Sequence, residues 1–387
     1  MEHRYPRVFV WCALANFTQA VSFALFLHFP GFLQGLGAGE SSIGLLMALP
    51  ALAGVVLGPS CGRLLDRHGR RPVILGGNLL NVAVIGGYLT CQTLSPALYL
   101  IRVLHGVAGT MLGSALLTYA ADIVPPARVA QGLALFGVSA MLAITVGGLL
   151  GEAALAWGGY PALLLTSLLC ALAGLGLTLR LAPPPPAAPP PAVPPRAWRA
   201  TLCQPDLVPL WVLAWAFFIA LAGVFTFLKT YVMATGLGSL GTFFTIYTCA
   251  AMVQRLALGG LPARLGLSRM LAPALLAVVL GLTLLSTARQ PWMLWCAGLF
   301  CGLGHGCAYP VLLGLVSRRA RVSERGTAIA LYTTIDDGAI LLAGPALGLL
   351  IEVAGYRYMF GSVAGGLALT ALLCWRWERQ RQAPEGS

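Results

Sequence analysis

Charged side chains are scarce in this sequence. Only 9% of its 387 residues are Asp, Glu, Lys or Arg, and 58% are apolar. A soluble domain normally has about a quarter charged residues. So few charges cannot cover the surface of a globular protein with polar groups. The composition therefore predicts an integral membrane protein, for which lipid is the main solvent.

Acidic residues and lysine are scarcest of all. The chain has 12 acidic residues against 24 basic ones, and Lys229 is its one lysine. In a soluble protein, a net charge of +12 would suggest a nucleic-acid partner. Here the arginines gather in alternate loops between apolar runs, a pattern that reports membrane orientation instead. We therefore expect a lipid bilayer around the chain and no nucleic acid.

Motifs for metal, redox or nucleotide chemistry are also missing. The ten cysteines lie mostly within apolar runs, and the sequence contains no CxxC pair, HExxH pair or nucleotide-binding loop. These absences favour neither a disulfide framework nor a zinc site. We expect no cofactor, no resident metal and no enzymatic activity.

Twelve apolar runs are what the sequence has in abundance. Runs of roughly 20 residues can cross a hydrocarbon core about 30 Å thick, and they must do so as helices. The expected spans are 8–30, 42–62, 73–93, 97–120, 131–155, 161–181, 207–229, 240–261, 269–288, 292–316, 327–351 and 357–375. The predicted fold class is an all-α integral membrane protein.

A proline-rich segment divides these runs into two sets of six. Residues 182–195 (APPPPAAPPPAVPP) cannot form a helix and favour an extended polyproline conformation. We interpret the segment as a spacer; a ligand for a proline-binding domain is the alternative. The expected organisation is an N-terminal six-helix bundle over 1–181, a cytoplasmic linker over 182–206, a C-terminal six-helix bundle over 207–376 and a cytoplasmic tail over 377–387.

The placement of basic residues predicts the orientation. If the N-terminus is cytoplasmic, 19 of the 24 basic residues lie on the cytoplasmic side. Only Lys229, Arg289 and Arg357 then lie on the outer side. Because lysine and arginine concentrate in cytoplasmic loops, both termini are expected in the cytoplasm.

The two halves share traces of an internal repeat. Adding 197 to Gly62, Leu64, Arg67 and Gly69 gives Gly259, Leu261, Arg264 and Gly266. The same offset relates Gly147 to Gly344 and Gly151 to Gly348. One offset that serves two separate regions indicates parallel, duplicated halves, a known plan among transporters.

The most specific motif lies between the second and third spans, over residues 62–72 (GRLLDRHGRRP). Gly62 would let two helices approach closely, and Gly69 would allow a tight turn. Asp66 would favour the positive end of a helix dipole. Three arginines would remain at the inner surface: Arg67, Arg70 and Arg71. The segment resembles the G-x-L-a-D-r-x-G-r-k-x signature of the major facilitator superfamily.

That resemblance implies a cytoplasmic gate at this loop. In the family, the acidic residue helps to hold the two halves together on the cytoplasmic side. The stretch from Asp122 to Arg128 also resembles a loop of the family, and these two residues could join Asp66 in a charge network. The alternative is a turn that caps the fifth helix. Ala263 stands where Asp66 would repeat, so the predicted gate is asymmetric.

Two further stretches resemble the same family. Arg102 and Gly106 match an R-x3-G pattern in which a buried arginine is linked to proton coupling; snorkelling to the interface is the alternative. The glycine-rich stretch 147–151 is similar to an antiporter motif but lacks its proline, and 344–348 partly repeats it. Small residues at this spacing also pack helices in any bundle, so they support efflux only modestly.

Ionisable and polar residues within the spans are candidate functional groups. Asp336 and Asp337 form the one acidic pair in an apolar run, and they are candidate proton carriers unless their span begins after them. His305 joins them and Arg102 as a coupling candidate, although packing is its alternative. Candidate cavity residues are Asn16, Gln19, Arg255 and Tyr309.

The resemblance implies a transporter that works by alternating access. Without a nucleotide-binding loop, proton exchange is the expected energy source. The leading hypothesis is proton-coupled efflux, or antiport, of a small drug or metabolite by a functional monomer in a bacterial inner membrane. Proton-coupled uptake by symport is the alternative. An intramembrane enzyme or a sensor is disfavoured, because the sequence lacks convergent catalytic ligands and an appended soluble domain.

Overall fold

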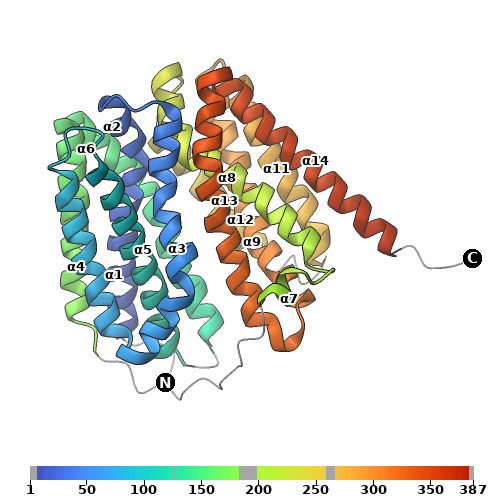
Figure 1. Ribbon diagram of the computed structural model, residues 1–387, viewed down its shortest axis with the longest axis horizontal. Helices are drawn as coiled ribbons and strands as arrows, with labels where there is room; N and C mark the ends of the chain where they lie inside the picture. The colour runs from blue at the N-terminus through green and yellow to red at the C-terminus, as the bar shows by residue number, and fades with distance from the viewer. Residues whose placement is uncertain (1–6, 126–127, 183–197, 259–265, 383–387) are drawn as a thin grey trace, which may run out of the picture. The chain divides into compact units, whose positions relative to one another are not determined.

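The computed structural model describes residues 7–125, 128–182, 198–258 and 266–382, and the described residues form helices with no strand. Most of the proline-rich segment and the loop 259–265, which contains Ala263, lie outside the described residues. Figure 1 shows the chain coloured from blue at its N-terminus to red at its C-terminus. Two compact units are distinguished: Met1–Pro191 with Leu240–Thr245, and Ala192–Ser239 with Ile246–Ser387.

The first unit contains the six spans predicted for the N-terminal half. Its elements are α1 (Arg7–Ala24), η1 (Leu25–His28), α2 (Phe29–Gly35), α3 (Glu40–His68), α4 (Arg70–Tyr88), α5 (Pro96–Ile123) and α6 (Val129–Leu179). α1, η1 and α2 run on as a single span. The range of α6 covers both the fifth and the sixth predicted spans. Gly158 and the positive-φ Gly159 leave the helical conformation, so the chain kinks between these two spans.

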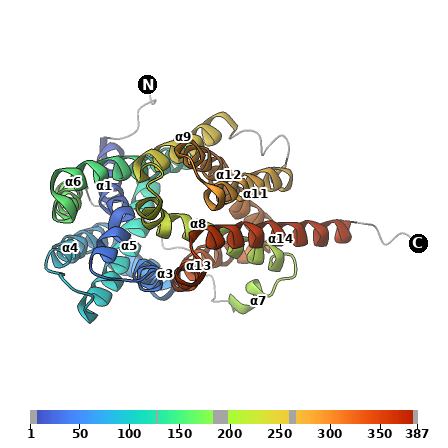
Figure 2. The same ribbon diagram turned by 90° about the horizontal axis from the view of Figure 1, so that it is seen from above.

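The second unit contains the remaining helices. They are α7 (Trp198–Leu202), α8 (Val208–Thr235), α9 (Leu240–Leu258), α11 (Leu267–Thr287), α12 (Pro291–Arg319), η3 (Val322–Glu324), α13 (Arg325–Ala354) and α14 (Tyr356–Gln382). The first six residues of α9 group with the first unit. Within the second unit, α8 lies beside α13 and α14 (Figure 2).

Nine stretches of the described chain are long and apolar enough to cross a membrane. One of the nine covers most of α6, which holds two helices on either side of its kink. α4 and α9 are not among the nine, yet they occupy the third and eighth predicted spans. The helices therefore correspond to the twelve predicted spans, and the all-α, twelve-helix fold class is confirmed.

The same helix crossing occurs in both halves. In α5, a Cβ atom on Gly106 would overlap the carbonyl oxygen of Pro50 in α3. In α12, a Cβ atom on Gly302 would overlap the carbonyl oxygen of Tyr247 in α9. Adding 197 to Pro50 gives Tyr247, and adding 196 to Gly106 gives Gly302. The duplicated halves therefore retain a crossing in which glycine brings two backbones into contact.

A turn glycine is duplicated as well. Gly69 has φ +81° and precedes α4, and Gly266 has φ +86° and precedes α11. L side chains rarely adopt this conformation, so glycine is favoured at both turns. The offset of 197 between these residues, predicted from sequence, thus relates two positions with the same backbone geometry.

Candidate functional site

Gly69 sets the geometry of the predicted gate loop. α3 ends at His68 and α4 begins at Arg70, so a single positive-φ residue separates the two helices. The backbone N–H of Gly69 donates to Leu65 at 3.0 Å and closes the last turn of α3. This tight turn places the first residue of α4 beside the last two turns of α3.

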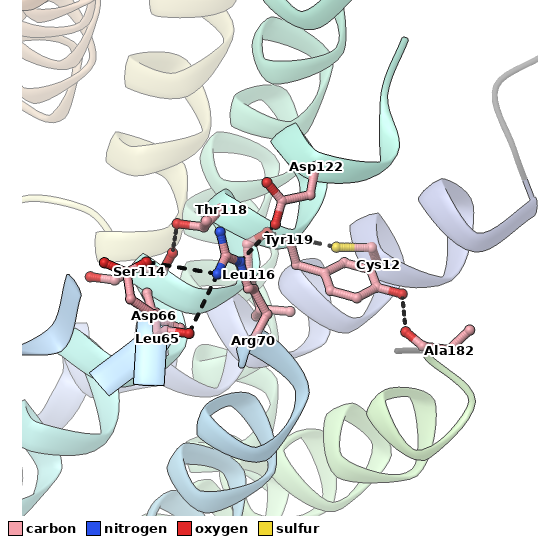
Figure 3. Close-up of polar contacts among 10 residues, drawn as sticks. All are labelled: Cys12, Leu65, Asp66, Arg70, Ser114, Leu116, Thr118, Tyr119, Asp122 and Ala182. Carbon is pink, nitrogen blue, oxygen red and sulfur yellow. Dashed lines mark hydrogen bonds and ion pairs between the residues drawn. The ribbon is translucent and has the colours of Figure 1, made fainter. Parts of the chain in front are cut away.

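Arg70 joins two acids from different helices (Figure 3). Its Nε donates to Asp122 Oδ2 in α5 at 2.7 Å, and its Nη1 lies 3.8 Å from Asp66 Oδ1 in α3. The Arg70 and Asp122 side chains are only 16% and 21% exposed, whereas Asp66 is 56% exposed. The short, partly buried contact with Asp122 is therefore the stronger of the two.

The other basic residues of this end have different positions. The Nη2 of Arg71 donates to the carbonyl oxygen of Leu179 at 3.3 Å, near the end of α6. Arg67 is exposed to solvent, and Arg128 precedes α6, where its backbone N–H donates to Pro125 at 2.8 Å. Gly62 lies within α3, but its surroundings are outside what the structure describes. The structure therefore brings Asp66, Arg70 and Asp122 together.

Arg102 is buried rather than extended toward an interface. Its side chain is 3% exposed, and its guanidinium carbon lies 5.8 Å from the Phe26 ring centre and 5.1 Å from that of Phe29. Its Nε donates to the carbonyl oxygen of Leu46 at 2.7 Å. Among the described residues it forms no ion pair. Carbonyl groups and aromatic rings hold the cation within the first unit, and this burial favours a packed arginine over one that snorkels to the interface.

The glycine-rich stretch of α6 faces the first span. A Cβ atom on Gly147 would lie 2.8 Å from the backbone carbon of Ala24, and one on Gly151 would overlap the His28 ring. His28 Nε2 in turn hydrogen-bonds the Gly148 carbonyl at 3.0 Å. These glycines therefore allow close packing of α6 on α1 and η1.

Aromatic and basic residues cluster in the second unit around His305. Its Nδ1 hydrogen-bonds the Tyr247 hydroxyl, and its ring lies 5.9 Å from that of Tyr309. The Nε of Arg255 donates to the Gly306 carbonyl at 3.4 Å, so α9 is fixed to α12 beside this ring. The hydroxyl of Tyr332 in α13 donates to the Tyr309 carbonyl at 3.1 Å. Three helices thus contribute to one polar and aromatic cluster.

Asp336 and Asp337 lie inside α13, beside that cluster. Both are half-buried, and both interact electrostatically with Tyr309. Arg255 interacts electrostatically with the same tyrosine. Neither acid forms an ion pair with any described residue. Two unpaired carboxyl groups inside an apolar helix are costly to retain, which marks them as candidates for function.

Asn16 and Gln19, two of the candidate cavity residues, lie in different environments. The Nδ2 of Asn16 donates to Ser139 Oγ at 2.9 Å. Gln19 is 2% exposed; its Nε2 donates to the Ala171 carbonyl at 3.0 Å, and its Oε1 accepts from Asn81 Nδ2 at 2.9 Å. Gln19 is therefore committed to packing between helices, because a buried amide needs partners on both sides.

The partners of Gln19 are asparagines that were not predicted as functional residues from the sequence. Asn78 hydrogen-bonds Gln19 and also donates to Thr178 Oγ1 at 3.1 Å, so the network links α1, α4 and α6. Asn78 and Asn81 are fully buried. Two asparagines three residues apart in an apolar run lie on one helix face, which was the available signal.

Comparison with known proteins identifies the family of this chain. The model of the Major Facilitator Superfamily matches residues 10–343 and 241–387. The chain is 26% identical over 363 residues to "Uncharacterized MFS-type transporter YhhS" of Escherichia coli K12, with 91% of this chain and 87% of that protein covered. It is 27% identical to the Salmonella typhi protein of the same description over the same shares.

Solved structures share the fold at low sequence identity. A POT family transporter in complex with 5-aminolevulinic acid has a TM-score of 0.82 at 14% identity, with 97% of each chain covered. The nucleoside transporter NupG has a TM-score of 0.73 at 14% identity, with 96% of this chain and 99% of that one covered. The human organic anion transporter MFSD10 has a TM-score of 0.69 at 19% identity, with 95% and 99% covered. At these identities, the likeness concerns the fold alone.

Proposed function

Because this chain belongs to the major facilitator superfamily and is a multi-pass membrane transporter rather than an enzyme, we propose that it exports a small organic molecule in exchange for protons. One observation carries the proton coupling: Asp336 and Asp337 lie side by side within α13, without an ion pair among the described residues. A carboxyl group in such a place can bind a proton and lose its charge, which changes the cost of leaving it inside the membrane.

Alternating access would couple that proton to the substrate. In this proposal, two bundles rock about a site near the middle of the membrane. Arg255, His305 and Tyr309 belong to the neighbouring cluster and are the proposed contacts for substrate. Arg102 is a proposed modulator, since it is a buried cation without a carboxylate partner among the described residues. Asn16 is retained as a candidate cavity residue in the first unit.

Arg70, Asp66 and Asp122 are the proposed cytoplasmic gate, with Arg67, Arg71 and Arg128 at the same end. The excess of arginine in alternate loops supports cytoplasmic termini and a bacterial inner-membrane location. The linker 182–206 would join the bundles 1–181 and 207–376, and 377–387 would form the tail. A monomer would be sufficient for this mechanism, because each chain has both halves.

Efflux is preferred over uptake because the gate loop and the partial antiporter motif occur together. Uptake by symport is the second candidate, because neither the fold nor the position of the acids fixes the direction of transport. The adjacent acids would serve either direction.

A transport assay separates these two candidates. Thermal-shift screening of the purified protein against metabolites and antibiotics would first select a compound that raises Tm. That compound, radiolabelled, would then be followed in proteoliposomes with an imposed pH gradient and a pH-sensitive dye. Antiport predicts compound movement opposite to the protons; movement in the same direction would overturn the efflux proposal.

Asp336→Asn and Asp337→Asn test the coupling residues in the same assay. We expect at least one of them to abolish compound-driven proton flux while counterflow without a gradient persists. Glu352→Gln is the matched control, because it removes an exposed acid near the C-terminal end of α13. Normal proton flux in both aspartate variants would show that the carrier lies elsewhere.

A further inference from the structure

An apolar groove lies between three helices of the second unit. It has a volume of about 400 Å³ and lies among α8, α11 and α14. The side chains that line it are mainly aliphatic, and they include Leu210, Leu213, Leu271, Leu275, Leu372 and Trp375. None of these residues takes part in the proposed gate or the proposed transport site.

The groove opens away from the core of its unit. Leu276 is 58% exposed, Leu372 is 43% exposed and Trp375 is 45% exposed. α14 supplies small side chains at Ala368 and Ala371, which leave room between it and α11. In both ribbon views the last turns of α14 extend beyond the other helices of this unit (Figures 1 and 2). An open aliphatic groove in a membrane-spanning unit fits a hydrocarbon chain.

One end of the groove is positively charged. Arg269 precedes Ala272 by three residues and Leu276 by seven, so it continues the stripe of α11 that lines the groove. Arg376 follows Leu372 by four residues and Ala368 by eight, so it continues the lining stripe of α14. Both arginines are exposed, and neither forms an ion pair with a described residue.

The backbone at this end also favours an anion. α8 begins at Val208 and α11 at Leu267, and neither first turn is capped by a side chain. Although the Val208 N–H of α8 already donates to the Gln204 carbonyl at 3.1 Å, the helix dipoles give these N-termini partial positive charge. Asp206 precedes α8 and offsets part of it. Trp375, whose amphipathic ring suits the membrane interface, marks the level at which the groove meets polar surroundings.

We propose that this groove is a binding site for an anionic phospholipid. One acyl chain occupies the aliphatic groove, and the phosphate lies between the guanidinium groups of Arg269 and Arg376. An acyl-sized apolar groove lies beside two arginines that form no ion pair with a described residue, and this juxtaposition selects an anionic lipid over a purely apolar molecule. Basic pockets between membrane helices bind lipid headgroups in this way. The site is independent of the proposed transport function.

The test compares two lipids that differ only in headgroup charge. Purified, delipidated full-length protein in a neutral detergent is titrated with phosphatidylglycerol or phosphatidylcholine of the same acyl chains, and thermal unfolding is recorded. Two arginines near the phosphate predict a half-saturating concentration roughly 10- to 30-fold lower for the anionic lipid. Native mass spectrometry of the same samples counts bound lipids and reports whether copies of the chain associate.

Matched variants locate the site. Arg269→Gln with Arg376→Gln should abolish the preference for phosphatidylglycerol, whereas Arg357→Gln at the other end of α14 should retain it. Ala371→Phe should prevent binding by filling the groove, whereas Leu373→Phe, on an exposed residue that does not line it, should not. Tm in lipid-free detergent shows that each variant is folded.

Several outcomes would overturn the proposal. Equal affinity for the two lipids would show that the arginines do not select a charged headgroup. An identical Tm shift with inorganic phosphate would show an anion site that needs no acyl chain. Unchanged lipid binding by Ala371→Phe would place the lipid elsewhere, and a lipid-independent dimer lost in that variant would make the groove an interface between copies.

Discussion

The Nε of Arg102 donates to the carbonyl oxygen of Leu46 at 2.7 Å. This carbonyl has no helical donor, because the residue four positions later is Pro50. In α3, the group that would bond Leu46 is the N–H of residue 50, which proline lacks. Arg102 supplies the missing donor from α5. Its Nη2 also reaches the Met47 carbonyl at 3.4 Å. The arginine therefore stabilises the turn of α3 in which proline removes one helical hydrogen bond, in addition to any role in coupling.

This relationship predicts a thermodynamic coupling between Arg102 and Pro50. Arg102→Met should lower stability by about 1–3 kcal/mol, because it leaves a buried carbonyl without a donor. In a Pro50→Ala background the helix provides its own donor, so the cost of Arg102→Met should be clearly smaller. A double-mutant cycle on unfolding in detergent measures this difference. Additive effects of the two changes would contradict the assignment.

Arg102→Lys separates position from charge. Lysine retains the positive charge but lacks the planar fork of donors. If the carbonyl contacts matter most, Arg102→Lys should lose stability and transport together, and Pro50→Ala should restore both. If the charge itself serves coupling, Arg102→Lys should transport normally while Arg102→Met in the Pro50→Ala background does not.

The repeated crossing predicts matched effects in the two halves. Gly106→Ala and Gly302→Ala would each force a methyl group onto a backbone carbonyl, so each should destabilise the protein by about 1–3 kcal/mol. Gly113→Ala is the control in α5, because no atom lies within 4 Å of the added Cβ. There alanine should be neutral or slightly stabilising, since it favours the helix. Tm values that do not separate Gly113→Ala from the other two would argue against the close crossing.

The twelve spans were predictable because each is a long apolar run, and the single turn at Gly69 followed from the glycine itself. The role of Gln19 in a buried hydrogen-bond network was not predictable. A pattern along one helix shows that a polar residue is present, but it does not show which neighbouring helix supplies Asn81 as its partner. Arg102 was equally ambiguous, because its burial depends on Phe26, Phe29 and Leu46, which come from three other elements. Tertiary pairing of polar groups therefore decided what the sequence left open.

The Gln19 network predicts a stability defect without a direct effect on substrate. Gln19→Leu should cost about 1–3 kcal/mol, because Asn78 and Asn81 would each lose a buried partner. Asn16→Leu is the comparison, since Asn16 is only partly buried and its side chain has one hydrogen bond with the described residues, to Ser139. Thermal unfolding should show the larger loss for Gln19→Leu. If Gln19→Leu had a normal Tm but had lost affinity for substrate, Gln19 would be a substrate-contacting residue and the stability prediction would be wrong.

The geometry of Arg70 predicts unequal contributions from its two acids. Asp122→Asn should lower stability by about 1–2 kcal/mol, because it removes the charge from a short contact that is mostly shielded from water. Asp66→Asn should change stability by less than about 0.5 kcal/mol, because Asp66 is 56% exposed and 3.8 Å from Arg70, so water screens the pair. Raising salt should reduce the effect of Asp66→Asn further while leaving that of Asp122→Asn nearly unchanged. Thermal unfolding at low and high salt checks both statements, and Arg70→Gln should reproduce the larger loss of stability.

A transport assay of Asp66→Asn addresses the gate itself. If this variant abolished transport with no change in Tm, the part of Asp66 in the gate would depend on another conformation, in which Asp66 gains a partner other than Arg70.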